Sequence, residues 1–472
     1  MSEPGGVWAA GRRRLTAGLV LTVTLVAFES LAISTVMPVV ADDLGGLRLY
    51  GWVFSGFFLG SLMGIVVAGQ LADERGTRLP FLIGLSCFAV GLAVGATAGS
   101  MGVLVAGRVA QGFGAGAIPA VAYVSVGRAY PADAQPRVFA VFSTAWVIPA
   151  LVGPAAASGL AEAWSWRAVF GALLPLVGLA AAMTVPALTT SRPAEGDAGA
   201  GSAAPPIRDR RLDALVLVAG AAAVLAGLGA GTPVIGAALV VGGAIPAVRA
   251  FIRLVPPGTL RVIAGLPAAV AVRGLLTFAF FGADAYVSLT LTEVRHTSTW
   301  MAGIPLTTAS LAWAGGAWVQ QREIAVRGPQ WLVRRGFLLV ALGIGGMLVV
   351  LHPVPVGAAV LAWSVAGLGM GLSFAPLSVT VLGLSEPGQE GASSSSLQLS
   401  DVLGVSLGTG LSGVFVALGE GRGWAVGSSL TLAFVVMLAV ALVGAWAAGR
   451  LPRGLSGAAG HGDRTAEHRL SA

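Results

Sequence analysis

The chain has almost none of the residues that build disulfide frameworks or Cys/His metal sites. It contains 472 residues, of which one is cysteine and four are histidine. Cys87 lies inside an apolar segment, and the histidines are scattered at His296, His352, His461 and His468. The chain therefore cannot form an internal disulfide, and no Cys/His ligand set has the spacing of a metal site.

Charge is also scarce, and the positive charge comes from arginine alone. Only 10% of the residues are charged, and all 28 basic residues are arginine because the sequence has no lysine. The net charge is +7, but the arginines are dispersed between apolar runs rather than clustered. This pattern is typical of membrane topology, so we expect no nucleic-acid partner.

Apolar residues, in contrast, are abundant. They make up 56% of the chain, and the mean hydropathy is +0.85. No soluble domain can bury that much apolar surface, so the bilayer must act as its solvent. The 69 glycines suit membrane helices that pack backbone against backbone.

The apolar runs, divided at charged and Gly/Pro-rich points, predict fourteen membrane spans. They cover residues 15–41, 50–72, 79–99, 101–127, 137–160, 166–188, 213–231, 233–252, 263–292, 300–321, 331–352, 355–383, 391–418 and 424–449. The first run has no signal-peptide cleavage site, and we expect it to be retained as a span. Spans 213–231 and 233–252 are joined by a short turn, and one re-entrant hairpin there would leave twelve spans.

Arginine positions predict the orientation, because cytoplasmic loops are rich in basic residues. With the N-terminus inside, 22 of the 28 arginines fall on the cytoplasmic side, and only Arg48, Arg167, Arg295 and Arg422 fall on the opposite side. We therefore expect a multi-pass protein of the inner (plasma) membrane with both termini in the cytoplasm.

Composition also predicts the domains. Residues 191–212 are rich in Ala, Gly, Pro and Ser and are expected to form a flexible cytoplasmic linker. The predicted parts are an N-terminal six-helix bundle (1–190), this linker, two extra spans (213–254), a C-terminal six-helix bundle (255–450) and a disordered cytoplasmic tail (451–472).

The loop after the second span carries the first recognisable motif. Its sequence, Gly69 to Arg78, resembles the loop signature G-x-L-a-D-r-x-G-r-k of the major facilitator superfamily, although Glu74 and Thr77 replace usual basic residues. The resemblance implies a latch that holds one conformation, formed by Gly69, Asp73, Arg75, Gly76 and Arg78. An ordinary positively charged loop is the alternative.

Span four contains an embedded arginine. The segment from Arg108 to Gly116 is similar to the superfamily signature R-x-x-q-G-x-G. An arginine within hydrocarbon costs several kcal/mol unless it is paired or hydrated, and Gln111 lies on the same helix face. The resemblance implies a role in proton coupling for Arg108 and Gln111. The alternative is an arginine that snorkels to the membrane interface.

Span one contains an embedded acid. The segment from Glu29 to Pro38 resembles D-x-T-x-x-N-x-A-L-P, the first-helix motif of the drug:proton antiporters with fourteen spans, with Ser34 in place of Asn. Hydrocarbon disfavours an ionised carboxylate, so such an acid can exchange a proton. We predict that Glu29 titrates or contacts a cation. A structural, hydrogen-bonded acid is the alternative.

Span five resembles the antiporter signature g-x-x-x-G-P-x-x-G-G, in which Gly153 and Pro154 match and Pro149, Ala157 and Ser158 stand in place of glycines. The family associates this segment with export, although a generic proline kink would look similar. The next segment, Trp164 to Phe170, resembles the W-R-x-x-F that opens span six in the same family.

The second half adds three embedded charges. Arg273 and Asp284 lie eleven residues apart in span nine, and Asp401 lies about two turns inside span thirteen. We expect these residues to line a central cavity opposite Glu29 and Arg108. For Asp401, a role at the cytoplasmic end of its helix is the alternative.

The resemblance therefore predicts an all-α integral membrane protein with the major facilitator fold: two six-helix bundles plus two additional central helices, fourteen transmembrane helices in all. It implies a monomeric, proton-driven antiporter that exports amphipathic or cationic small molecules by alternating access. Its expected partners are this substrate, protons and the lipid bilayer, and no cofactor is expected. A transporter of one metabolite, siderophore, lipid or self-made antibiotic would carry the same motifs. An embedded enzyme or receptor would need a clustered catalytic set, which the dispersed histidines do not provide.

Overall fold

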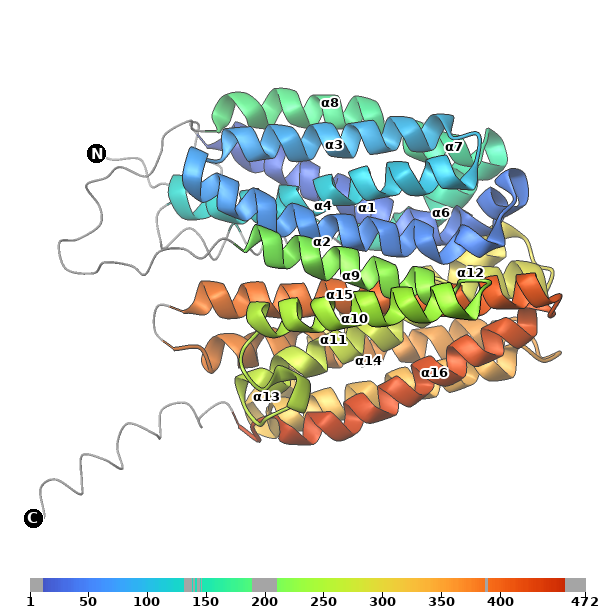
Figure 1. Cartoon of the computed structure of the whole chain (residues 1–472). Coiled ribbons are helices and arrows are strands. Elements are labelled where there is room, and N and C mark those ends of the chain that lie inside the picture. The colour runs from blue at the N-terminus through green and yellow to red at the C-terminus, as the bar shows by residue number, and fades with distance from the viewer. Residues whose placement is uncertain are drawn as a thin grey trace, which may run out of the picture. The chain divides into compact units, whose positions relative to one another are not determined.

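The computed structural model describes residues 12–130, 138, 141, 145, 147–188, 210–386 and 389–454. These residues form long helices joined by short connections, and no strand occurs among them (Figure 1). The chain divides into two compact units, residues 1–247 with 298–303 and residues 248–297 with 304–472. Most of the predicted linker (191–209) and tail (455–472) lies outside the described residues, and the predicted domain boundaries stay predictions.

The first unit contains the helices of the N-terminal half. They are α1 (Arg13–Leu44), α2 (Tyr50–Arg75), α3 (Arg78–Thr97), α4 (Met101–Ala129), α6 (Val147–Ala163), α7 (Trp166–Gly171), α8 (Leu173–Thr184), α9 (Arg211–Leu228) and the larger part of α10 (Pro233–Leu254), with 3-10 turns η1 (Leu47–Leu49) and η2 (Val185–Ala187). Local chemistry sets several helix ends. Gly45 and Gly46 have positive φ angles of 64° and 87° between α1 and α2, and the Ser100 hydroxyl accepts the Val103 N–H at the start of α4.

The second unit contains the helices of the C-terminal half. They are α11 (Leu266–Asp284), α12 (Val287–Leu289), the π-helical turn η4 (Thr290–Val294), most of α13 (Thr299–Val350), α14 (Gly357–Gly383), α15 (Glu390–Arg422) and α16 (Val426–Ala447), with 3-10 turns η3 (Thr259–Arg261) and η5 (Ala448–Arg450). Most of these boundaries fall within a few residues of the predicted spans.

The exception is α13, which covers two predicted spans. It runs for 52 residues, or roughly 78 Å, whereas a bilayer core is about 30 Å thick. Its backbone leaves helical geometry at Gly328, where φ is 73° and ψ is 167°, and Pro329 follows. Two helices therefore meet end to end at this point.

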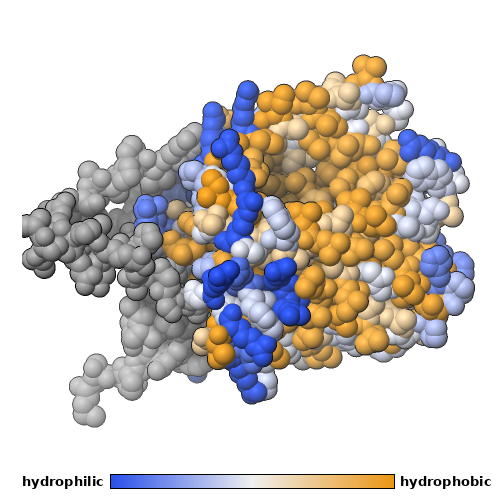
Figure 2. All heavy atoms as spheres, turned by 90° about the horizontal axis from the view of Figure 1, so that it is seen from below, coloured by the Kyte–Doolittle hydropathy of each residue, from blue (hydrophilic) through white to orange (hydrophobic). Residues whose placement is uncertain are grey.

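Twelve helices among the described residues are long and apolar enough to cross a membrane. This number counts α13 once and leaves out α6, which has 17 residues, so it does not confirm fourteen spans. The helices α9 and α10 are separate, and each satisfies the criterion alone. On the face shown in Figure 2, apolar side chains cover the middle, and a band of hydrophilic side chains borders them on one side.

Glycine faces bring helix backbones into direct contact. A Cβ on any of four glycines at the α2–α4 contact would collide with a carbonyl oxygen of the facing helix; these are Gly60, Gly64, Gly112 and Gly116. In the second unit, Gly404 and Gly408 of α15 lie in the same way against Gly274 and Phe278 of α11. In each of these helices the glycines are four residues apart, which places them on one helix face and allows the close contact.

Substitution at this contact should lower stability. In Gly116→Ala, the added methyl meets the Ser61 backbone carbonyl, and we expect a loss of about 1–3 kcal/mol from overpacking. Gly178→Ala on α8 is the matched control, because no atom lies within 4 Å of its Cβ position. Thermal unfolding in detergent should show a lower Tm for the first variant and an unchanged or higher Tm for the second; equal values would contradict the packing.

Candidate functional site

The embedded acid of α1 and the embedded arginine of α4 form a buried ion pair. Arg108 Nη1 donates to Glu29 Oε1, and the two side chains are 1% and 2% exposed. The same Nη1 donates to Gln111 Oε1 at 2.8 Å. The structure thus brings together the three residues that the sequence singled out in the first half. Arg108 does not snorkel, because its side chain is fully enclosed.

Helix α2 provides the other contacts of Arg108. The Val53 carbonyl accepts its Nε–H at 3.2 Å, and the guanidinium carbon lies 4.2 Å from the centre of the Phe57 ring. These contacts depend on the glycine face, because Gly112 lies against the backbone of Phe57. A bulkier residue at 112 would push Phe57 away from the guanidinium.

Several polar atoms of this cluster are buried without a hydrogen bond. They are Glu29 Oε2, Gln111 Nε2 and, on α1, Thr35 Oγ1. Burying an ionised pair costs several kcal/mol per ion, which is recovered only when the remaining polar atoms are satisfied. Because Glu29 Oε2 has no such partner, it is the oxygen at which a proton can be added without breaking an existing hydrogen bond.

The helix with the antiporter-like signature packs on the helix of Glu29. In α6, a Cβ on Gly153 would lie 3.7 Å from the Leu31 side chain and 3.9 Å from the Phe28 carbonyl oxygen. Gly153 therefore faces the α1 residues on either side of Glu29. Pro154 lies inside α6 and is buried, as is Pro149. The roles predicted for these residues stay predictions.

Trp166 and Arg167, the first two residues of α7, form hydrogen bonds to neighbouring helices. Trp166 Nε1 and Arg167 Nη1 both donate to Asp43 Oδ2 at the end of α1, at 3.0 and 2.8 Å. Arg167 Nη2 also donates to the Ala98 carbonyl at 2.9 Å. These bonds hold α7 to the ends of α1 and α3. Sequence reasoning missed Asp43 as the partner of these two side chains.

The predicted latch residues lie mainly in the last two turns of α2 rather than in a loop. Gly69, Asp73 and Arg75 belong to α2, Gly76 directly follows it, and Arg78 begins α3. Gly76 ends α2 with a φ of 81°, a conformation that favours glycine, whereas Asp73, Arg75 and Arg78 are exposed and Gly69 lies in open space. Glu74, which departs from the family signature, pairs with Arg211 at the start of α9 at 2.5 Å. Such exposed pairs contribute little to stability, but this one connects the end of α2 to the start of α9.

In the second unit, Arg273 pairs with Asp401 rather than with Asp284. Its Nε donates to Asp401 Oδ1 at 3.1 Å and its Nη1 to the Phe374 carbonyl at 2.7 Å. The guanidinium also stacks on the Phe374 ring, 3.1 Å from its centre. Arg273 is 5% and Asp401 21% exposed. Asp401 therefore joins α11 to α15 within the helix bundle.

Asp284 has a different partner. Its Oδ1 accepts the indole N–H of the buried Trp363 on α14 at 2.7 Å. The Trp363 ring stacks on Phe280, which in turn contacts Trp313 edge-on. Sequence reasoning missed this aromatic cluster. The adjacent pair Phe280-Phe281, one turn before Asp284, was the available signal.

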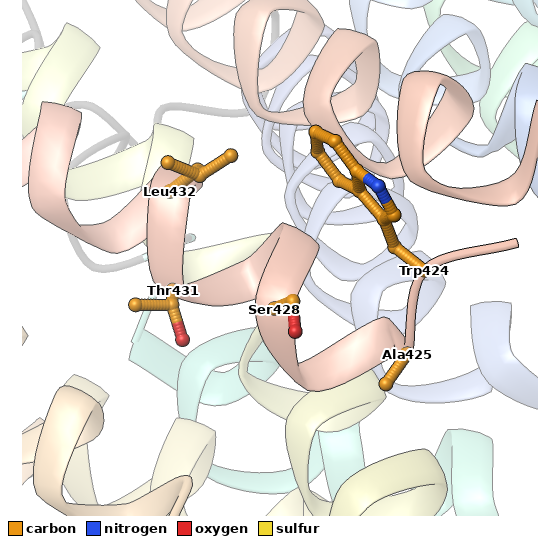
Figure 3. A pocket seen from close by; sticks show the side chains of 5 residues that line it. All are labelled: Trp424, Ala425, Ser428, Thr431 and Leu432. Atoms are coloured by element: carbon orange, nitrogen blue, oxygen red, sulfur yellow. The ribbon is translucent and has the colours of Figure 1, made fainter. Parts of the chain in front are cut away.

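One further concave region lies at the start of α16. It is a shallow pocket lined by Trp424, Ala425, Ser428, Thr431 and Leu432 (Figure 3). None of its lining residues is ionisable or belongs to the predicted site.

Comparison with known proteins agrees with the motifs. Residues 19–409 match the family model of the Major Facilitator Superfamily. A protein of Mycobacterium tuberculosis (strain ATCC 25618 / H37Rv), named "Probable multidrug-efflux transporter", is 27% identical over 474 residues, covering 96% of this chain and 99% of that protein. The "Acurin A biosynthesis cluster MFS-type transporter" of Aspergillus aculeatus (strain ATCC 16872 / CBS 172.66 / WB 5094) is 32% identical over 167 residues, 35% of this chain and 30% of that one.

Solved structures show the same fold. The structure of a POT family transporter in complex with 5-aminolevulinic acid superimposes with a TM-score of 0.65 at 14% identity, covering 91% of this chain and 94% of that one. Together, the family match, the apolar helices and the buried ionisable residues lead to one conclusion. The chain belongs to the major facilitator superfamily and is a multi-pass membrane transporter rather than an enzyme.

Proposed function

We propose that this transporter is a proton-coupled antiporter that exports amphipathic or cationic small molecules by alternating access. The observation that carries the proposal is the buried ion pair of Glu29 and Arg108, in which Arg108 also donates a hydrogen bond to Gln111. Charged residues inside membrane spans are costly and mark ion or substrate pathways. An acid that is paired with arginine and retains one unbonded oxygen can switch between two states by gaining or losing a proton.

The proposed switch follows from this geometry. Protonation of Glu29 removes the negative charge and leaves Arg108 with Gln111, the Val53 carbonyl and the Phe57 ring. The lost attraction favours a different arrangement of α1 and α4. Because α6 packs beside Glu29 on α1, it would move with that change. Substrate then leaves outward while protons enter, and the proton gradient supplies the energy without a cofactor.

The identity of the cargo rests on the relatives. The Mycobacterium tuberculosis relative, similar over almost its whole length, is named as a multidrug-efflux transporter. A second candidate is export of one self-made compound, favoured by the similarity to a transporter of a biosynthesis cluster. Screening the same vesicles with many unrelated amphipathic compounds separates the two. Broad acceptance supports multidrug export, and a single accepted compound supports the second candidate.

We also propose fourteen spans, in a monomer of the inner membrane with both termini in the cytoplasm. The break at Gly328 divides α13 into two segments, and α6 together with the preceding residues of its predicted span would supply another. The separate helices α9 and α10 support the two extra spans between the proposed bundles 1–190 and 255–450.

Labelling of single cysteines tests the span count. In a Cys87→Ala background, Thr232→Cys in the exposed turn between α9 and α10 should react with a membrane-impermeant maleimide added outside intact cells. Ser202→Cys, in the proposed linker, should react only after the membrane is opened. An unreactive Thr232→Cys in intact cells that labels after lysis would favour a re-entrant hairpin and contradict fourteen spans.

Replacing the buried acid tests proton coupling. The test uses inside-out vesicles whose membrane contains the Glu29→Gln variant. We expect their uptake of ethidium, driven by an imposed pH gradient, to be at least about tenfold lower than that of wild-type vesicles, because the titratable group is gone. Downhill exchange of ethidium should continue. Glu323→Gln, a surface acid on α13, is the matched control and should behave as wild type. Unchanged gradient-driven uptake in Glu29→Gln would contradict the proposal.

A further inference from the structure

Three helix ends of the second unit meet at the break in α13. A Cβ on Gly328 would collide with the Arg453 carbonyl oxygen, and Gln330 Nε2 donates to the Gly449 carbonyl at 2.5 Å. The backbone N–H of Gln330 also donates to the Pro452 carbonyl at 3.3 Å. The residues that follow α16 therefore lie against the point where the two segments of α13 join. We call this place, formed by residues 322–335 and 446–454, the α13–α16 junction.

The position of the junction along its helices indicates that it lies at a surface of the bilayer. Helix α13 is too long for one span and breaks near its middle, whereas α16 is about one span long and ends at Ala447. Two exposed tryptophans, Trp331 and Trp446, lie within one turn of these ends. Tryptophan is enriched where the hydrocarbon meets the headgroups. We therefore expect the junction to contact lipid headgroups.

Positive charge predominates at the junction. Its two segments contain a single acid, Glu323, and six arginines. All six arginine side chains are exposed: Arg322, Arg327, Arg334, Arg335, Arg450 and Arg453. This surface therefore attracts an anionic partner and repels a cationic one.

Tryptophan rings hold three of these arginines in place. The guanidinium carbons of Arg327 and Arg335 lie 4.3 and 5.5 Å from the centre of one and the same ring, that of Trp331. The guanidinium carbon of Arg450 lies 4.7 Å from the centre of the Trp446 ring. A cation held over an aromatic face is already ordered, so less side-chain entropy is lost when it binds a ligand. Two guanidinium groups around one ring also repel each other, and a bound anion would offset that repulsion.

Most of the hydrogen-bonding capacity of these guanidinium groups remains. Arg327 Nε pairs with Glu323 Oε2 at 2.5 Å, and Arg450 Nη1 donates to the Arg261 and Val262 carbonyls at 2.9 and 2.8 Å. Among the described residues, these contacts use one nitrogen of each guanidinium, which has five N–H donors in a planar fork. The remaining N–H groups match the oxygens of a phosphate, which arginine binds through two parallel hydrogen bonds.

We propose that the α13–α16 junction is a binding site for an anionic phospholipid, in which Arg327 and Arg335 donate to the headgroup phosphate and Trp331 positions both guanidinium groups. Arg450 adds positive charge at the same junction. The occupant is a lipid rather than a soluble anion, because exposed tryptophan rings adjoin the arginines where the spans end. In the proposed topology this is the cytoplasmic leaflet, whose surface is negatively charged. The inference goes beyond the proposed function, because it depends on neither the cargo nor proton coupling.

Native mass spectrometry counts bound lipid directly. Detergent-purified protein is titrated with phosphatidylglycerol, and the dissociation constant of the first bound lipid is measured. We expect the double variant Arg327→Gln/Arg335→Gln to bind at least about tenfold more weakly than wild type, because two arginine–phosphate contacts are lost. Arg422→Gln is the matched control and should bind as wild type does. Arg422 is also exposed and lies over a tryptophan ring, that of Trp424, but at the other end of α16.

The Trp331 ring distinguishes a built site from general attraction to positive charge. Trp331→Leu leaves every arginine in place, and we expect it to weaken phosphatidylglycerol binding about threefold or more because both cation–ring contacts are lost. Trp331→Phe should retain most of the binding. An unchanged Tm in lipid-free detergent verifies that each variant is folded.

Two further measurements test the nature of the ligand. Phosphatidylcholine, which has no net charge, should bind wild type much more weakly than phosphatidylglycerol does, and excess glycerol phosphate should not displace the lipid. Equal phosphatidylglycerol binding by wild type and the double arginine variant, or by wild type and Trp331→Leu, would overturn the proposal. Displacement by glycerol phosphate would overturn it as well, because the site would then bind a soluble anion.

Discussion

A charge inside a membrane bundle is tolerated only where the protein replaces the water that the charge has lost. Arg108 illustrates how much of a structure this can involve, because its guanidinium has a carboxylate, an amide oxygen, a backbone carbonyl and a ring around it. Two of these four come from α2, and they reach the guanidinium only because glycines let α2 and α4 approach to backbone contact. The buried ion pair therefore depends on the glycines, because close packing of the helices provides part of the polar environment of Arg108.

The second unit contains two embedded charged groups whose lost hydration is replaced in different ways. Arg273 is satisfied by Asp401 and Phe374, so that its charge is neutralised within the bundle. Asp284 is satisfied only in part, by one indole N–H. This difference in partners separates residues that look alike in the sequence.

Much of the fold could be predicted from the sequence because the length of an apolar run and the glycine content of a helix are local properties. The helix ends agree with most predicted spans, and glycines of α2 and α15 lie where helix backbones touch, as the glycine content indicated. The proximity of Gln111 to Arg108 was also predictable, since both lie on one face of span four, whereas the pairing of Arg108 with Glu29 was not predicted. The polar residues around Gly328 locate the boundary between two spans. They do not show that helix extends to Gly328 from both sides, as it does in α13.

Other contacts could not be predicted, because they depend on how each helix is rotated about its own axis. Every residue has a backbone carbonyl, so the sequence does not indicate that the carbonyl of Val53 is the one that accepts a hydrogen bond from Arg108. The choice of Asp401 rather than Asp284 as the partner of Arg273 depends on which faces of α11 and α15 meet. Asp43 and Trp363 became visible only once distant segments were placed side by side. Sequence reasoning found the costly residues, and the structure supplied the partners that satisfy them.

The central claim is that Glu29 gains and loses a proton inside its pair with Arg108. Infrared difference spectroscopy of the protein in lipid, recorded across a pH step, reports this directly through the carbonyl stretch of a protonated carboxylic acid. We expect a band that appears on acidification in wild type, persists in Glu323→Gln and is missing in Glu29→Gln. A spectrum that is the same in wild type and Glu29→Gln would contradict the account.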